Sequence, residues 1–346
     1  MGDANCVRHV IPIVRAPGVS ALHIVRPAPR PTGLPDDRLR YVEVSGRSPV
    51  IRVLKTLFVA LRECRRSEVR GVISFNAIPY GMIALLVGFV ARRPVHVGFV
   101  GSEAHKLDRS WLLRRLDMLL RHAAVFSVPG PTMARALVGR RYPPGSVYEL
   151  PNGVDTTVFS PPEEGSVRDI DVLFMGALIG LKQVDQILRA IPLVASRLRP
   201  VTMAVVGTGP LRSELEDLVA HLDLREQVVF AGYQVDPEAW LRRARSIVIA
   251  SRWEGVPFVV VEAMCVGTVP IATRVGSVPD VIDHGVNGLL LESASPDVIA
   301  AALTDVLGDV DLERRLRMGA LRARERFDYA SATRVWAQLI DAMRVA

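Results

Sequence analysis

The chain has 346 residues, 49% of them hydrophobic, and a formal net charge of +7. Its length is sufficient for two domains of ordinary size, and its hydrophobic content excludes a disordered chain and suits buried parallel sheets. The basic residues gather in residues 1–150, which hold 23 Lys and Arg against 10 Asp and Glu, a net charge of +13.

This basic half can meet an anionic lipid surface, a phosphorylated acceptor or nucleic acid. Alternatively, it reflects a chain that prefers arginine everywhere, since 40 of the 43 basic residues are Arg. Cys6, Cys64 and Cys265 have neither metal nor disulfide spacing, so we expect reduced thiols in a cytosolic protein. The start lacks the layout of a signal peptide, and the longest apolar run, 79–91, is shorter than the ~20 residues that span a bilayer.

In the first half, strand-like apolar runs alternate with helical patterns. The strands are expected at 10–14, 22–25, 40–44, 72–75, 95–100 and 124–128. The helices are expected at 50–66, 79–91, 109–121 and 131–138. A segment rich in Pro, Gly and acidic residues, 143–168, interrupts this alternation and contains the expected connection between two domains.

A second alternating series follows. Its strands are expected from 171 onward and at 203–206, 228–231, 247–250, 269–272 and 288–291. Its helices are expected at 183–198, 211–222, 237–243 and 257–266, and three more close the chain, the last at 329–343. Two such series predict an α/β protein of two facing, doubly wound Rossmann-like domains, with ligands bound in the interdomain cleft.

Two acidic residues mark a candidate site in the second half. Seven residues lie between Glu254 and Glu262, and most of them are apolar. Pro257 suits the first position of a helix, so Glu254 is expected in the preceding loop and Glu262 inside a buried helix. A carboxylate in such a helix is unfavourable unless a partner satisfies it. Two acids along one loop–helix junction can contact opposite ends of one polyhydroxylated ligand.

Three glycine-containing turns follow strands of the second half and surround these acids. They contain Gly176 and Gly180, then Gly207 and Gly209, then Gly276. Such turns can present backbone N–H groups to a phosphate, although glycine also serves tight chain reversal. Lys182 follows the first turn in a chain with only three lysines, and its compact charge suits a diphosphate.

Five motifs together resemble glycosyltransferase family 4, and the resemblance runs from about residue 77 to 343. The motifs are Pro151-Asn-Gly-Val-Asp155 with Phe159, Phe174-Met-Gly176 with Lys182, Val206-Gly-Thr-Gly209-Pro, Glu254-x7-Glu262-Ala-Met, and Gly285-x-Asn-Gly288. The resemblance implies the GT-B fold and sugar transfer with retention of anomeric configuration. It also implies the domain roles. Residues 1–150 form an acceptor-side domain, shortened at its start, and 151–168 form a linker. Residues 169–325 bind the nucleotide sugar, and 326–346 form a C-terminal helix that packs back on the first domain.

The resemblance assigns roles to individual residues. Glu262 is expected to hold the ribose hydroxyls, Lys182 the diphosphate, and Glu254 the sugar. Lys182, Glu254 and Glu103 are the candidate catalytic residues. The other expected donor contacts are Gly176, Gly207, Gly209, Gly255, Val256, Pro257 and Phe258. No metal and no cofactor are expected beyond the donor itself.

The chain departs from the family pattern at two positions. Ala177 stands where the family usually has an arginine that contacts the diphosphate, which leaves Arg212, Arg252 or Arg274 as substitutes. Val100 stands where the family often has a histidine, with Glu103 in place of its aspartate and His105 nearby.

The sequence therefore predicts a retaining glycosyltransferase in polysaccharide, glycolipid or glycoconjugate biosynthesis. We expect it in the cytoplasm, with an anionic or lipid-linked acceptor, peripheral contact with the inner membrane face and no nucleic acid partner. One alternative is a degenerate nucleotide-binding partner of a related subunit, and another is a nucleotide-sugar epimerase. A dinucleotide oxidoreductase is less consistent, because Gly207-Thr-Gly209 lacks the third glycine of that fingerprint.

Overall fold

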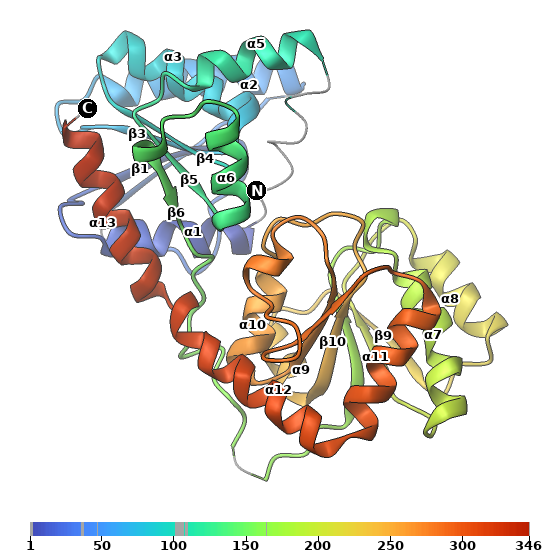
Figure 1. The fold of residues 1–346 in the computed structure, drawn as a ribbon. Coiled ribbons are helices and arrows are strands. Elements are labelled where there is room, and N and C mark those ends of the chain that lie inside the picture. The colour runs from blue at the N-terminus through green and yellow to red at the C-terminus, as the bar shows by residue number, and fades with distance from the viewer. Residues whose placement is uncertain are drawn as a thin grey trace. The chain divides into compact units, whose positions relative to one another are not determined.

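The computed structural model describes residues 3–35, 38–46, 48–100, 107, 110–163 and 165–345. These residues form two compact α/β units, coloured from blue to red along the chain in Figure 1. Unit 1 comprises Met1–Gly153 and Asp328–Ala346, and unit 2 comprises Val154–Phe327. The chain therefore passes from unit 1 to unit 2 within the predicted linker and returns just ahead of its last helix. No described helix combines the length and hydropathy that crossing a membrane requires.

Unit 1 is built on a four-stranded parallel sheet in the order β3-β4-β5-β6, with β1 and β2 forming a separate parallel pair. The strands are β1 (Leu22–Arg26), β2 (Leu39–Glu43), β3 (Val72–Phe75), β4 (Val95–Gly98), β5 (Val125–Val128) and β6 (Val147–Glu149). The helices are α1 (Asp3–Arg15), α2 (Pro49–Cys64), α3 (Met82–Ala91), α5 (Trp111–Leu120), α6 (Pro131–Gly139) and α13 (Tyr329–Val345), and a π-helical turn at Ala77–Gly81 leads into α3.

The two faces of this sheet are covered by different helices. Val97 of β4 packs in one cluster with Ala84 of α3 and Leu120 of α5. Val125 of β5 packs in the other cluster with Ile13 of α1 and with Trp336, Leu339 and Met343 of α13. The last helix of the chain is thus part of the core of unit 1.

The prediction of a strand at 10–14 is wrong, because these residues lie in α1. The run is rich in β-branched residues, which favour strands when taken locally. Its buried side chains nevertheless recur at helical spacing, at Cys6, Val10, Ile13 and Val14. Packing against α13 favours the helix over the strand, and α1 forms although Pro12 lies inside it. The short strand β6 also lies in a segment that was expected to be irregular.

Unit 2 contains a six-stranded parallel sheet in the order β12-β11-β10-β7-β8-β9. Numbered within the unit, this is the order 3-2-1-4-5-6 of dinucleotide-binding sheets. The strands are β7 (Ile170–Met175), β8 (Met203–Val206), β9 (Val228–Gly232), β10 (Ala244–Ile249), β11 (Val269–Thr273) and β12 (Leu289–Leu291). The helices are α7 (Val184–Arg197), α8 (Arg212–His221), α9 (Pro237–Arg243), α10 (Phe258–Val266), α11 (Pro296–Gly308) and α12 (Val310–Ala323).

Helices cover both faces of this sheet, which explains why its strands are almost continuously apolar. Along β7, Val172 and Phe174 pack on the side of α7, α8 and α11. Leu173 packs on the other side, among residues of α9, α10 and α12. The predicted doubly wound sheet is confirmed in this unit.

Backbone approaches between neighbouring loops fix the carboxyl edge of this sheet. A Cβ atom on Gly207 would lie 1.9 Å from the carbonyl oxygen of Gly176, and one on Gly276 would lie 1.7 Å from that of Glu254. Both glycines also have positive φ, +134° and +53°. Glycine is therefore required at these positions for loop packing as well as for backbone conformation.

We predict that Gly276→Ala lowers the free energy of unfolding by at least about 2 kcal/mol, since left-handed strain adds to the clash with Glu254. Gly180→Ala is the matched control, because a Cβ there meets nothing within 4 Å. Thermal denaturation measures both variants, and equal midpoints would contradict the explanation.

Two buried histidines give unit 1 a pH-dependent stability. His9 stacks on Phe75 with ring centroids 4.4 Å apart, and His96 meets Trp336 edge-on at 5.0 Å. Burial lowers the pKa of His9 to about 4 and that of His96 to about 3. The unfolded chain, with ordinary histidine pKa values near ~6.5, therefore takes up these protons first as the pH falls.

We predict that the unfolding free energy is highest above pH ~6.5 and falls below it by up to about 1.4 kcal/mol per pH unit for each histidine. Urea unfolding at a series of pH values measures this slope. The exposed His221 provides the control, since His221→Gln should leave the slope unchanged. A flat profile between pH ~7 and ~5 would refute the prediction.

Candidate functional site

The strand order of unit 2 places the candidate site at one edge of its sheet. β7 pairs with β10, and the order of the chain reverses at this pair. Ligands of open α/β sheets bind outside the carboxyl ends of the strands at such a reversal. The loops that leave these two ends carry Lys182 and Glu254, so the sheet brings together two residues that are 72 positions apart.

Lys182 and Glu254 form an ion pair across the two loops, with Lys182 Nζ on Glu254 Oε1. The same carboxylate oxygen accepts a hydrogen bond from Ser251 Oγ at 2.6 Å. Arg252 N–H donates to the Leu181 carbonyl at 3.0 Å, which ties the loops together next to the pair. The side chains of Lys182 and Glu254 are 23% and 12% exposed, so the pair is open to a ligand yet held in place. The sequence analysis did not identify Ser251 as a site residue, although it lies just before Glu254 in the chain.

Glu262 lies in α10, the helix that follows the Glu254 loop, and is only 3% exposed. The prediction of a buried helix is confirmed, since every residue from Val260 to Val266 is buried. Its start differs by one position: Pro257 is the N-cap, with ψ of 126°, and Phe258 is the first helical residue. The 255–258 segment therefore links Glu254 in the loop to Glu262 inside the helix. Gly255 and Phe258 are half-buried and Val256 and Pro257 are buried, so this segment is a packed turn.

The glycine turns around the pair are engaged with one another. Gly176 N–H donates to the Val206 carbonyl at 2.9 Å, and Gly207 N–H donates to the Gly232 carbonyl at 2.7 Å. Gly209 packs against the backbone of Leu178. The structure thus gives these glycines a role in holding the loops, whereas their contact with a phosphate stays a prediction.

The structure distinguishes among the three arginines considered as substitutes at Ala177. Arg212 pairs with Glu216 at 2.8 Å, and Arg274 pairs with Glu292 at 2.7 Å. Arg252 is exposed and forms no ion pair with any residue that the structure describes. Ala177 itself is exposed. Among the three, Arg252 is the cation available beside Lys182.

Two residues considered in the sequence, Glu103 and His105, lie outside the described residues. Val100, which precedes them, is half-buried.

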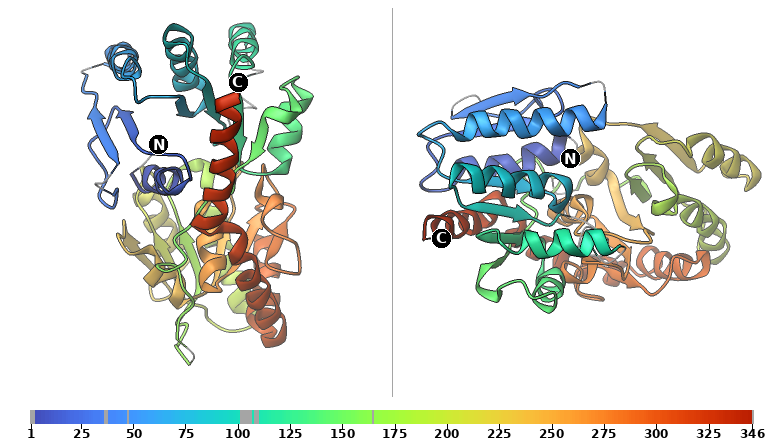
Figure 2. Two further views of the ribbon diagram at one scale, coloured as in Figure 1. Left: turned by 90° about the vertical axis from the view of Figure 1, so that its left-hand side faces the viewer. Right: turned by 90° about the horizontal axis from the view of Figure 1, so that it is seen from above.

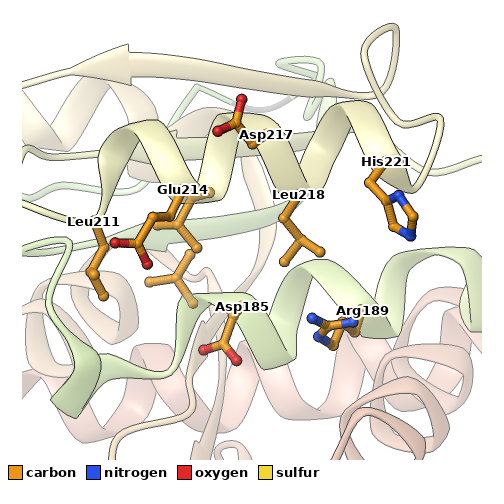
Figure 3. A pocket seen from close by; sticks show the side chains of 9 residues that line it. Asp185, Arg189, Leu211, Glu214, Asp217, Leu218 and His221 are labelled. Atoms are coloured by element: carbon orange, nitrogen blue, oxygen red, sulfur yellow. The ribbon is translucent and has the colours of Figure 1, made fainter.

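A groove of ≈ 470 Å³ lies between α7 and α8 (Figure 3), and neither Lys182 nor Glu254 is among the residues that line it. Asp185, Glu214 and Asp217 line it together with Arg189 and His221, and leucines form its apolar part. Three carboxylates repel a diphosphate, so this groove does not suit an anionic nucleotide. Among the described residues, no cluster of three or more His, Cys, Asp or Glu has the arrangement of a metal site.

The sequence of unit 2 is similar to the sequences of known glycosyltransferases. Residues 159–322 match the family model of glycosyl transferases group 1. An uncharacterized glycosyltransferase of Methanocaldococcus jannaschii is 34% identical over 141 residues, 40% of this chain and 36% of the relative. A D-inositol 3-phosphate glycosyltransferase of Thermobispora bispora is 32% identical over 220 residues, 58% of this chain and 51% of the relative. The chain thus spans about half the length or less of these curated relatives.

The fold also matches that of a solved structure along nearly the whole chain. Anabaena Alr3699/HepE in complex with UDP-glucose superimposes with a TM-score of 0.81 at 17% identity, over 99% of this chain and 96% of that one. This likeness concerns the fold, which is GT-B, as the motifs predicted. The similarity to glycosyl transferases group 1 thus lies in residues 159–322, which make up most of unit 2.

Proposed function

We propose that this protein is a retaining glycosyltransferase that moves a sugar from a nucleotide diphosphate sugar to a hydroxyl acceptor. The observation that carries the proposal is the Lys182–Glu254 pair at the reversal of the unit 2 sheet, with Glu262 buried in the helix that follows. A cation suits the diphosphate, and a carboxylate accepts hydrogen bonds from vicinal hydroxyls of a sugar or ribose.

In the proposed reaction, the bond between the sugar anomeric carbon and the diphosphate oxygen breaks. The acceptor oxygen bonds to the same face of that carbon, and its proton passes to the leaving diphosphate. Lys182 stabilises the charge that develops on the diphosphate, and Arg252 lies beside it as a second cation. Glu254 orients Lys182 before the donor binds and contacts the sugar afterwards. The proposed reaction needs neither a metal nor a further cofactor.

The relatives support this choice of substrates. The Thermobispora relative is named for an inositol phosphate acceptor, and the Anabaena structure contains UDP-glucose. By analogy, we propose a nucleotide sugar as donor and an anionic or lipid-linked hydroxyl compound as acceptor, in polysaccharide, glycolipid or glycoconjugate biosynthesis. We propose a cytoplasmic protein that contacts the inner membrane face.

A second candidate function is a nucleotide-binding partner without catalytic activity. Two observations favour it: Ala177 supplies no cation, and the charge of Lys182 is already neutralised by Glu254. This protein would bind nucleotide sugars without turnover.

We predict that nucleotide diphosphate sugars raise the thermal midpoint and are turned over by the purified chain. Lys182→Gln should lower kcat by about 10²–10³, because it removes charge stabilisation in the transition state. Glu262→Gln should raise the donor Kd about tenfold or more, because a charged hydrogen-bond acceptor is lost. Calorimetry and a coupled assay for nucleotide release measure the two effects.

Glu214→Gln makes the same change as Glu262→Gln in the α7–α8 groove and should leave donor binding unchanged. Binding without turnover in the wild type would select the partner function. Isomerised donor without acceptor would select an epimerase. No binding to any nucleotide sugar would refute both the transferase and its alternatives.

We predict further that Ala177→Arg raises the transferase rate or the donor affinity, because it adds a cation at an exposed position next to Gly176. Ala177→Gln adds similar length without charge and is the matched control. Equal donor Kd and kcat in the two variants would show that position 177 does not face the diphosphate.

A further inference from the structure

Three helices of unit 1 share an unusual exposed surface. Every exposed residue of α2, α3 and α5 is apolar, basic or proline. They carry 11 of the 23 large hydrophobic side chains that are exposed in the described chain. These side chains are Val50, Ile51, Leu54 and Phe58 of α2, Leu86, Phe89 and Val90 of α3, and Trp111, Leu112, Met118 and Leu119 of α5. Phe58, Phe89 and Trp111 are 69%, 84% and 74% exposed.

No carboxylate of these helices is exposed. Their two acids, Glu63 and Asp117, are 5% and 2% exposed. Glu63 is bound by His23 and Arg66 at 3.0 Å each. Asp117 is bound by Arg121 at 2.9 Å and accepts a hydrogen bond from Tyr142 at 2.7 Å. The negative charges of these three helices therefore lie in the interior of unit 1.

Positive charge stays at the surface between the apolar side chains. The exposed basic residues are Arg52, Lys55 and Arg62 of α2 and Arg114 and Arg115 of α5. An open groove of ≈ 1580 Å³ beside α3 adds Arg70, Arg92 and Arg93 along a wall that contains Phe89. Exposed apolar side chains on all three helices are therefore accompanied by exposed basic side chains on α2 and α5 and by the arginines of this groove.

The three helices lie side by side in one layer, with α3 between α2 and α5 (Figure 2). Their buried sides face β1, the sheet strands β3 and β4, and one another, so the exposed residues form the outer side of the layer. We name this side, defined by the 11 apolar and five basic residues above, the helical face.

We propose that the helical face is a docking surface for an anionic lipid bilayer. An amphipathic surface with aromatic and aliphatic side chains among Lys and Arg inserts its apolar side chains at the level of the headgroups, where its cations meet lipid phosphates. This inference rests on the proposed function, which includes contact with a membrane. It deepens that function by naming the surface through which the protein would bind a membrane that carries a lipid-linked acceptor.

Charge distinguishes the bilayer from other occupants. A second copy of the chain would bring five Arg and Lys of each helical face together without an exposed carboxylate to oppose them. Nucleic acid offers phosphates but gives no apolar phase for Leu54, Leu86 or Met118. A bilayer that contains anionic lipid supplies both an apolar phase and negative charge.

The experiment is co-sedimentation of the full chain with vesicles of phosphatidylcholine alone or mixed with phosphatidylglycerol. We expect binding to the mixed vesicles that weakens with added salt, and little binding to phosphatidylcholine alone. The double variant Arg114→Glu/Arg115→Glu should weaken this binding about tenfold or more. Phe58→Ser/Phe89→Ser should weaken it comparably, since both side chains are mostly exposed in the free protein.

Matched variants in unit 2 serve as controls. Arg197→Glu/Arg225→Glu reverses two exposed charges, and Tyr233→Ser/Val235→Ser removes two exposed apolar side chains. Both should bind vesicles as the wild type does. Thermal shifts with nucleotide sugars, measured on all variants, report the donor site separately, so either the docking surface or the proposed activity can fail alone.

Two results would overturn the proposal. The first is vesicle binding that is equal in helical-face and control variants. The second is a dimer in sedimentation velocity that Phe58→Ser/Phe89→Ser converts to monomer, which would assign the face to a second copy of the chain.

Discussion

The pairing of β7 with β10 is the constraint on which the candidate site depends. These strands are far apart in the chain, and their contact places the Lys182 loop against the Glu254 loop. The neighbouring loops are then fixed by backbone contacts that leave no room for a Cβ atom at Gly207 or Gly276. The site is thereby held by main-chain packing, and its side chains need little reorganisation before a ligand binds.

Charged residues lie at both ends of β7 and β10, but they have different partners and different exposure at the two ends. At the amino ends, Asp171 binds Arg199 at 2.8 Å and Arg245 at 3.2 Å, and Arg245 also binds Glu313. Although burial acts to raise it, the pKa of Asp171 is lowered by Arg199, Thr202 and Arg245. This network joins the sheet to α12, with the carboxylates of Asp171 and Glu313 buried and Arg199 at the surface. At the carboxyl ends, Lys182 and Glu254 are partly open and have few other polar partners, which suits exchange with a ligand.

The organisation of unit 1 explains how the helical face can exist without destabilising the fold. α1 and the returning helix α13 fill one side of the sheet with large side chains such as Trp336. α3 and α5 fill the other side with Ala84 and Leu120, which leaves their outer surfaces free to vary. In these helices, apolar residues on one side form the core, and apolar residues on the other side are exposed. Hydropathy alone does not distinguish the two groups.

The sequence by itself determined most strands and helices of unit 2, because most of these strands are buried on both faces and their apolar runs are bounded by glycine-containing turns. It also indicated Lys182, Glu254 and Glu262, since lysine is rare in this arginine-rich chain and acids are unexpected beside an apolar helix. It misplaced α1, because a run of β-branched residues satisfies strand and helix alike until a partner is present.

Only the tertiary structure decided which side chains meet. Ser251 joins Glu254, Arg212 and Arg274 are taken by carboxylates while Arg252 is not, and α13 packs on α1 more than 300 residues away. Local periodicity in the sequence does not predict such long-range contacts, because they depend on the order of the strands and on the return of the chain to unit 1. Packing of the whole unit sets both.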